Sequence, residues 1–248
     1  MGLIFLAAAL AADSSPSMVT LATGGVTVVD GKTRSPAPAA PFLLTGTQTL
    51  DLAPGAHVVI LRGGGAFSAD GPKTVDARTL APAASGTSSV GDLLSKRTSL
   101  AGAGAARAGG LAVTRPVPGA PAFAIGEVRW RCEACGPQDV SLVDLREDTV
   151  VWTARGEGTV RYDGPALTPG VYAVRVGAQE VSLRLAPTSE RDKLLTGTAL
   201  ANPADQAAAE AGALLLAGYP TDALTRLEAA GLGTLVQETE RIVGVDPR

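Results

Sequence analysis

Residues 57–62 read HVVILR, and four apolar residues follow one another directly within this stretch. A strand with one face in water alternates apolar and polar residues, so an unbroken apolar run predicts a strand buried on both faces. Shorter segments on either side have strand character and are separated by Gly and Pro. We therefore predict an all-β domain of five to seven short strands over residues 18–80. The other candidate strands lie in residues 18–30, 49–52, 66–69 and 73–77, with Asp70-Gly71-Pro72 as the turn between the last two.

A second block of alternation covers residues 125–187. In EVRWRC (127–132) the apolar residues occupy one face and two arginines the other. Six such segments separated by turn residues predict an antiparallel, immunoglobulin-like β-sandwich. Arginines at the outward positions are expected to form a solvated sheet face. These arginines are Arg129, Arg131, Arg161, Arg175 and Arg184.

Tyr172 follows a Pro-Gly turn in the segment LTPGVY (167–172). The turn places the tyrosine at the start of a strand, where its ring can pack and its hydroxyl can return to the upstream backbone. This is the arrangement of a tyrosine corner. Tyr172 is therefore predicted to have a structural role in the sandwich.

The segment between the two β domains differs in composition. Residues 81–124 are rich in Ala, Gly, Ser and Pro, and a connection of this length predicts a linker and a domain boundary. Within it, SVGDLLSKR (89–97) is a candidate short helix with a serine N-cap.

The hydrophobic period changes to that of helices over residues 188–248. Asn202-Pro203 is a good start for a helix that Gly218 ends, and further helices are expected from Pro220 and from about Thr234. The segment 214–230 resembles the turn of a tetratricopeptide-type helical hairpin. Because stacked repeats need several units and one is visible, we expect a helical cap or docking tail. The predicted fold class is thus mainly β with a C-terminal α segment.

The N-terminal residues 2–12 read GLIFLAAALAA and are followed by polar residues and Pro16. The apolar run has the length of a signal-peptide core and is shorter than the roughly 20 residues that span a bilayer. We predict a signal peptide over residues 1–12, cleaved near Ala12 or Asp13, and a mature chain in the periplasm or outside the cell. The alternatives are a short buried element or a mis-assigned start codon.

Composition limits the chemistry of this chain. Its 21 basic and 24 acidic residues give a net charge of −3, which provides no electrostatic basis for nucleic-acid binding. One His and two Cys exclude a His-rich metal site and a four-cysteine zinc site. The His, His57, begins the HVVILR segment and is expected to be structural or on the surface. We expect no catalytic residues, no metal site and no cofactor, hence no enzyme.

Cys132 and Cys135 form the sharpest local motif, Cys-Glu-Ala-Cys. The pair could be a redox dithiol, half of a metal site or a local disulfide. A redox dithiol is activated by a helix N-terminus, whereas this pair follows a predicted strand and precedes Pro137. The missing helix favours a disulfide formed in an oxidising compartment.

Several short motifs in residues 18–80 together resemble the FecR-type extracytoplasmic domain. They are GGVTV (24–28), LLTGTQTLDL (43–52), the HVVILR strand, and a final set of residues in the pattern G-x-F-S-x-x-G-P-x-x-V. The residues of that final set are Gly65, Phe67, Gly71, Pro72 and Val75. Members of this family are β-rich, periplasmic and non-catalytic, and some relay iron-siderophore signals from outer-membrane receptors to a sigma factor. The sequence has no segment corresponding to their transmembrane anti-sigma region, so the resemblance implies an envelope binding or scaffold module.

Three functional hypotheses follow. The first is an exported, non-enzymatic envelope protein that binds a protein or a glycan through its β domains. The second is a periplasmic thiol-disulfide oxidoreductase that uses Cys132 and Cys135. The third is a periplasmic signalling partner of a sigma-factor and receptor system.

Overall fold

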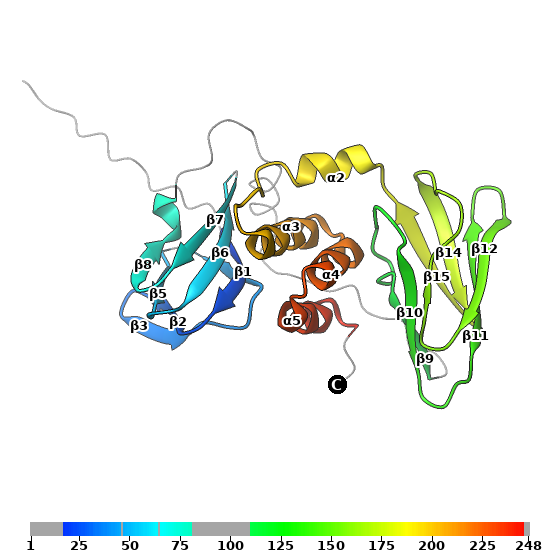
Figure 1. Ribbon diagram of the computed structural model, residues 1–248, viewed down its shortest axis with the longest axis horizontal. Helices are drawn as coiled ribbons and strands as arrows, with labels where there is room; N and C mark the ends of the chain where they lie inside the picture. The colour runs from blue at the N-terminus through cyan, green and yellow to red at the C-terminus, as the bar shows by residue number, and fades with distance from the viewer. Residues whose placement is uncertain (1–16, 46, 64, 81–109, 246–248) are drawn as a thin grey trace, which may run out of the picture.

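The computed structural model describes residues 17–245 apart from Gly46, Gly64 and the segment 81–109 (Figure 1). The predicted signal peptide over residues 1–12 and the candidate helix over 89–97 lie outside the described residues. The coarse fold prediction is confirmed: antiparallel sheets make up most of the regular structure, and helices follow them at the C-terminal end.

The first β unit (residues 17–80) contains eight strands within its described residues, arranged in two four-stranded antiparallel sheets. One sheet has the order β4-β1-β6-β7 and the other β3-β2-β5-β8. The chain crosses between the sheets several times, so strands that follow one another in sequence often lie in different sheets. The strands are β1 Ser17–Thr23, β2 Val26–Asp30, β3 Thr33–Pro36, β4 Phe42–Leu44, β5 Thr49–Leu52, β6 His57–Arg62, β7 Gly65–Asp70 and β8 Lys73–Asp76, and the 3-10 turn η1, Ala77–Thr79, follows them.

Strand β6 is buried on both faces, which confirms the prediction from HVVILR. Val58 and Ile60 lie in the core between the two sheets. Val59 and Leu61 point to the opposite side, into a separate core formed with the C-terminal helices. The sheet that contains β6 therefore needs a second covering layer outside the sandwich.

The second β unit (residues 110–187) has seven strands among its described residues, in two antiparallel sheets. A three-stranded sheet has the order β13-β10-β9 and a four-stranded sheet the order β12-β11-β14-β15. Between them lies an apolar core that contains Trp130, Leu142, Trp152 and Val174. The strands are β9 Leu111–Arg115, β10 Glu127–Cys132, β11 Gln138–Asp144, β12 Thr149–Gly156, β13 Thr159–Arg161, β14 Gly170–Val176 and β15 Gln179–Leu185.

The predicted linker over residues 81–124 differs from the structure in its last third. Strand β9 lies there and pairs with β10, with Val113 opposite Trp130. The residues after β9 are also largely buried, including Val117 and Phe123. Short apolar side chains among Ala, Gly and Pro gave little periodicity, and the burial comes from partners distant in the sequence. The second β unit consequently begins at residue 110, just before β9, and not at residue 125.

Four helices follow in the described chain: α2 Thr188–Leu194, α3 Pro203–Ala217, α4 Pro220–Ala229 and α5 Gly233–Val243. The predicted boundaries of α3 are confirmed. The Asn202 side chain accepts hydrogen bonds from the amides of Ala204 and Asp205, and Gly218 ends the helix with a φ of 87°. Helix α2 is short, because the chain turns at Leu195 and reaches Gly197 with a φ of 88°. Among the described residues, no helix combines the length and apolarity needed to cross a membrane.

Helices α3, α4 and α5 form a helical layer between the two β units (Figure 1). Helix α3 packs on β1 and β6 of the first β unit. Its buried side chains and those of α4 and α5 join Met18, Val59 and Leu61 in one continuous apolar core. The helical layer thus covers the outer face of the β4-β1-β6-β7 sheet, although more than a hundred residues separate the two in sequence.

Gly212 allows α3 to approach this sheet closely. A Cβ atom at Gly212 would lie 2.3 Å from Cγ2 of Thr20 and 3.0 Å from a methyl group of Leu61. Thr20 has little freedom to move, since its hydroxyl lies 3.4 Å from the Val59 carbonyl oxygen. The absence of a side chain at this one position therefore sets the separation between helix and sheet.

We predict that Gly212→Ala destabilises the protein by about 1–3 kcal/mol, because overpacking outweighs the gain of about 1 kcal/mol in helix propensity. The matched control is Gly233→Ala in the first turn of α5, where a Cβ has no neighbour within 4 Å. That change should alter stability by no more than about 1 kcal/mol. Urea unfolding followed by circular dichroism measures both, and an equal effect of the two substitutions would contradict this account of the packing.

Candidate functional site

Cys132 and Cys135 lie at disulfide-bonding distance in the turn between β10 and β11, with their Cα atoms 5.5 Å apart. Cys132 ends β10, and two residues, Gly136 and Pro137, separate Cys135 from the start of β11 at Gln138. The pair is therefore flanked by strands on both sides. A helix N-terminus, which lowers the pKa of the reactive thiol in dithiol oxidoreductases, does not adjoin it in the described chain.

Tyr172 is buried in the core of the second β unit, with 2 % of its surface exposed. Its hydroxyl donates a hydrogen bond of 2.8 Å to the carbonyl oxygen of Thr168, four residues upstream. The ring thus packs in the core while the hydroxyl is hydrogen-bonded, and this bond joins β14 to the turn that leads into it.

Two of the arginines expected on a solvated sheet face point instead into the helical layer. Arg129 donates to a carboxylate oxygen of Glu228 at 3.0 Å, and Arg131 donates to the carbonyl oxygen of Val245 at 2.9 Å. Their side chains stay 35 and 42 % exposed, so these two arginines lie at the edge of the contact with the C-terminal segment and keep part of their surface in water. Strand alternation shows which residues share a face but does not show what covers it.

Arg115 is the centre of the contact between the second β unit and the helical layer. Its side chain is 2 % exposed and lies near three carboxylates: Glu127 at 3.3 Å, Glu228 at 2.5 Å and Glu240 at 3.3 Å. Burial alone would raise the pKa of Glu228, but hydrogen bonds and charge from Arg115 and Arg129 hold that pKa below its ordinary 4.5. This cluster could not be predicted from the sequence, because Arg115 lies in the predicted linker and two of its partners are in the helices.

A second contact between these layers is made by Asp222, in the first turn of α4. Its carboxylate accepts hydrogen bonds of 3.0 and 3.2 Å from the backbone amide of Phe123. The Phe123 ring stacks on Tyr219, with the ring centres 4.1 Å apart. Burial raises the pKa of Asp222 from 3.8 to about 6, although hydrogen bonds from backbone amides, that of Phe123 first among them, lower this pKa.

The remaining candidate for chemistry, His57, lies between two carboxylates, Asp70 and Asp205. In the described part of the chain, no group of three or more His, Cys, Asp and Glu side chains is arranged to hold a metal ion.

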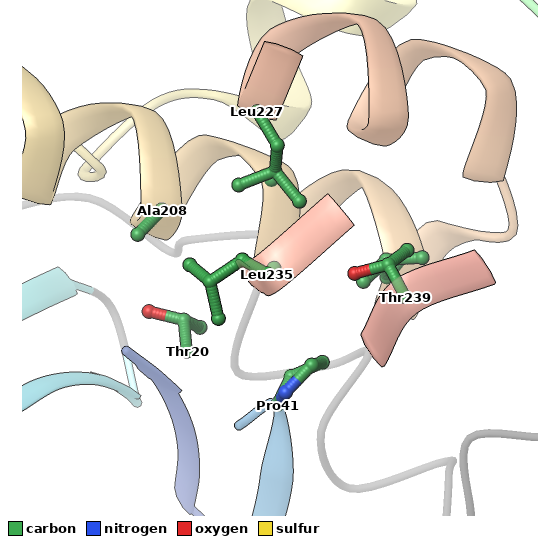
Figure 2. Close-up of a pocket in the computed structure, with 9 residues that line it drawn as sticks. Thr20, Pro41, Ala208, Leu227, Leu235 and Thr239 are labelled. Carbon is green, nitrogen blue, oxygen red and sulfur yellow. The ribbon is translucent and has the colours of Figure 1, made fainter. Parts of the chain in front are cut away.

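The interior void shown in Figure 2 lies between β1 and the helical layer. Its volume of about 10 Å³ matches a single water molecule, and its lining is mostly apolar. The Thr239 hydroxyl is buried beside it, without a hydrogen-bond partner among the described residues. The void is a gap in packing and is too small for a larger ligand.

The outer face of the β12-β11-β14-β15 sheet carries the large apolar side chains that stay exposed in the described chain. These are Leu145, Val150 and Val171, with 40, 56 and 43 % of their surfaces exposed. The amide of Leu145 bonds to the Val171 carbonyl oxygen, and Val150 is opposite Val143, two residues before Leu145. Directly opposite residues, and residues two apart, share a face of a sheet, so the three side chains form one apolar patch.

A polar hollow adjoins this patch toward the other end of the same sheet. Ser141 of β11, Thr153 of β12 and Arg175 of β14 line it, together with Arg155. Arg155 pairs with Asp139 at 3.7 Å and Arg175 with Glu180 at 2.6 Å. The outer face therefore has an apolar end and a charged, hydrogen-bonding end.

Comparison with protein-family models, with curated proteins and with solved structures finds no match for this chain. The FecR-like and immunoglobulin-like assignments therefore stay predictions.

We predict that Arg115→Met destabilises the protein by about 3 kcal/mol, because the buried cation is lost and Glu228 and Glu240 keep only Arg129 and the more distant Arg131. Arg155→Met is the matched control. Arg155 and its partner Asp139 are 69 and 83 % exposed, so this change should cost less than about 1 kcal/mol. Urea unfolding monitored by tryptophan fluorescence gives both values, and similar costs would show that the cluster does not hold the layers together.

We predict that Asp222→Asn removes a component of stability that falls as the pH rises. The pKa of Asp222 is about 6 in the folded protein against an ordinary 3.8, so the folded state binds the extra proton between these values. The stability from this proton is complete below about pH 4 and is lost through pH 6, amounting to up to about 3 kcal/mol. The unfolding free energy of the wild type relative to Asp222→Asn, measured from pH 4 to 7.5, should therefore fall by up to about 3 kcal/mol as the pH rises.

Glu228→Gln provides a control of opposite sign. The lowered pKa of Glu228 means that its contribution is present above pH 4.5 and is lost as the pH falls. If the effects of Asp222→Asn and Glu228→Gln on the unfolding free energy changed with pH in the same direction, the opposite pKa shifts of the two residues would both be contradicted.

Proposed function

We propose that this chain is an exported, non-enzymatic scaffold protein of the cell envelope that binds a protein partner through the outer face of the β12-β11-β14-β15 sheet. The observation that carries the proposal is the apolar patch of Leu145, Val150 and Val171. Contiguous exposed apolar side chains beside polar groups are typical of protein interaction sites.

The sheet beneath the patch is well packed. Leu142, Trp152 and Val174, on β11, β12 and β14, fill the core on the opposite face of the sheet. The helical layer is on the other side of the second β unit, next to β9 and β10, so this face stays open (Figure 1). A rigid and open face loses little entropy on binding.

The side chains of the face favour a protein over a glycan. Sugar rings are commonly held on exposed aromatic side chains, whereas the exposed large apolar residues of the described chain are Leu and Val. Trp130, Trp152 and Tyr172 are buried in the core beneath. Aliphatic side chains with Arg155 and Arg175 nearby suit an apolar protein surface with an acidic rim.

We also propose that residues 18–80 form a FecR-like domain and that the second β unit is immunoglobulin-like. The motifs of the FecR resemblance fall on strands of a compact two-sheet unit, and GGVTV leads into β2. The seven described strands of the second β unit match the strand number of a constant-type immunoglobulin domain, and the Tyr172 hydroxyl bond is that of a tyrosine corner. Export is supported by the apolar run at residues 2–12 and by the paired cysteines.

The binding face can be tested by placing a photo-crosslinking side chain at position 150 in cells that express the full chain. We expect a discrete crosslinked partner from this position and none from position 34 on β3, whose arginine side chain is 68 % exposed. Once the partner is identified by mass spectrometry and purified, Val171→Asp should weaken its binding by about tenfold or more. Equal crosslinking from both positions, or unchanged binding by Val171→Asp, would overturn the assignment of this face.

The same preparation tests export. Mass spectrometry of the purified chain should give an N-terminus near Ala12 or Asp13 and cysteines that react with alkylating reagents only after reduction. Retention of Met1 would contradict export. A pair that is reduced readily and has a low thiol pKa would favour the oxidoreductase hypothesis instead.

A further inference from the structure

His57 joins the first β unit to the helical layer. It begins β6, and its ring lies between Asp70 at the end of β7 and Asp205 in the first turn of α3. The distance from Nδ1 to Asp70 is 2.7 Å and that from Nε2 to Asp205 is 2.9 Å. Asp205 and His57 are 148 residues apart in sequence, so this contact depends on the docking of α3.

The protonation state of the ring decides how many of these contacts are hydrogen bonds. An imidazolium donates from both nitrogens, whereas a neutral imidazole donates from one and presents a lone pair at the other. A lone pair facing a carboxylate oxygen is repulsive. Both carboxylates can therefore be bound at once only when the ring carries two protons.

The two carboxylates differ in their access to water. The Asp70 side chain is 83 % exposed and can be solvated when the ring turns neutral. The Asp205 side chain is 5 % exposed, and the imidazolium is the cation beside its carboxylate. Loss of the counter-charge beside a buried carboxylate costs free energy. Because Asp205 belongs to α3, deprotonation of His57 destabilises the contact of this helix with the first β unit.

The charged groups that face the ring are Asp70 from β7 and Asp205 from α3, while the residue opposite it on β1 is the uncharged Thr23. Burial alone would lower the pKa of His57, but the hydrogen bonds and charges of the two aspartates raise the pKa above 6.5. Because the folded-state pKa is the higher one, the resulting stability is complete below pH 6.5. It is lost as the pH rises through the folded value.

We propose that His57 is a pH-sensitive latch that holds the first turn of α3 against the first β unit when the ring is doubly protonated and loosens it when the ring is neutral. The first residues of this turn, Asn202 and Pro203, are exposed, and a shallow surface hollow adjoins them. Asp205 is buried in that turn, so its pairing with His57 joins the exposed end of α3 to the first β unit.

The latch can be measured directly, since the chain contains one His. In a proton NMR titration of the full chain, the imidazole should titrate with a midpoint above 6.5. Asp205→Asn should lower that midpoint by about one pH unit or more, and Asp70→Asn should lower it less because Asp70 is solvated. A midpoint at or below 6.5, or one that Asp205→Asn leaves unchanged, would overturn the proposal.

Hydrogen exchange read by mass spectrometry tests the effect on α3. Wild type and His57→Gln are compared at pH 6 and at pH 8.5, so that the intrinsic exchange rates cancel at each pH. Relative to His57→Gln, the wild type should protect the first turn of α3 more strongly at pH 6, by about tenfold for each unit by which the pKa is raised. This difference should decrease as the pH rises from 6 to 8.5.

Comparison with His57→Gln also removes the effect of Asp222, which is the same in both proteins. Equal protection of α3 in wild type and variant at pH 6 would show that the ion pairs are static contacts, and would overturn the latch. The outcome does not depend on whether the outer sheet face binds a partner.

Discussion

The structure depends on the need to cover both faces of the sheet that contains β6. Val58 and Ile60 are covered by the second sheet of the first β unit, but Val59 and Leu61 would face water without α3. Burial of such side chains contributes roughly 1.5–3 kcal/mol each, which is large against the stability of a typical domain. The helix that meets this need is rich in alanine and has Gly212 at the closest approach, so its backbone can lie directly on the sheet.

This constraint explains how the rest of the chain is arranged. The first β unit and the helical layer share one apolar core, although the second β unit lies between them in sequence. The second β unit has an apolar core of its own and meets the helical layer partly through charges, with Arg115 buried among Glu127, Glu228 and Glu240. The junction with the first β unit is mainly apolar, whereas that with the second combines apolar contacts such as Val117 and Phe123 with a cluster of ion pairs, so salt and pH act differently on the two.

Much of the local structure could be predicted from the sequence, because its causes are local. Apolar runs and alternation located β5, β6 and most strands of the second β unit, and Asn202 and Gly218 bounded α3. The functional contacts could not be predicted in this way. His57 meets Asp205 across 148 residues, Arg115 meets Glu228 across 113, and Phe123 meets Asp222 across 99. Periodicity assigns a side chain to a face, but only the tertiary fold determines whether water, a carboxylate or another layer lies opposite it.

The two outer faces of the second β unit show why this distinction bears on function. Arg129 and Arg131 would predict a solvated face, yet Arg129 pairs with Glu228 of α4 and Arg131 bonds to Val245 just after α5, and both stay partly exposed. The face with Leu145, Val150 and Val171 is the apolar one, and it is open. If internal stability alone determined the arrangement, covering the apolar face would release more free energy than covering charges that must first be desolvated. An arrangement that keeps the apolar face open, on a rigid sheet and away from the helical layer, is the one that a protein partner requires.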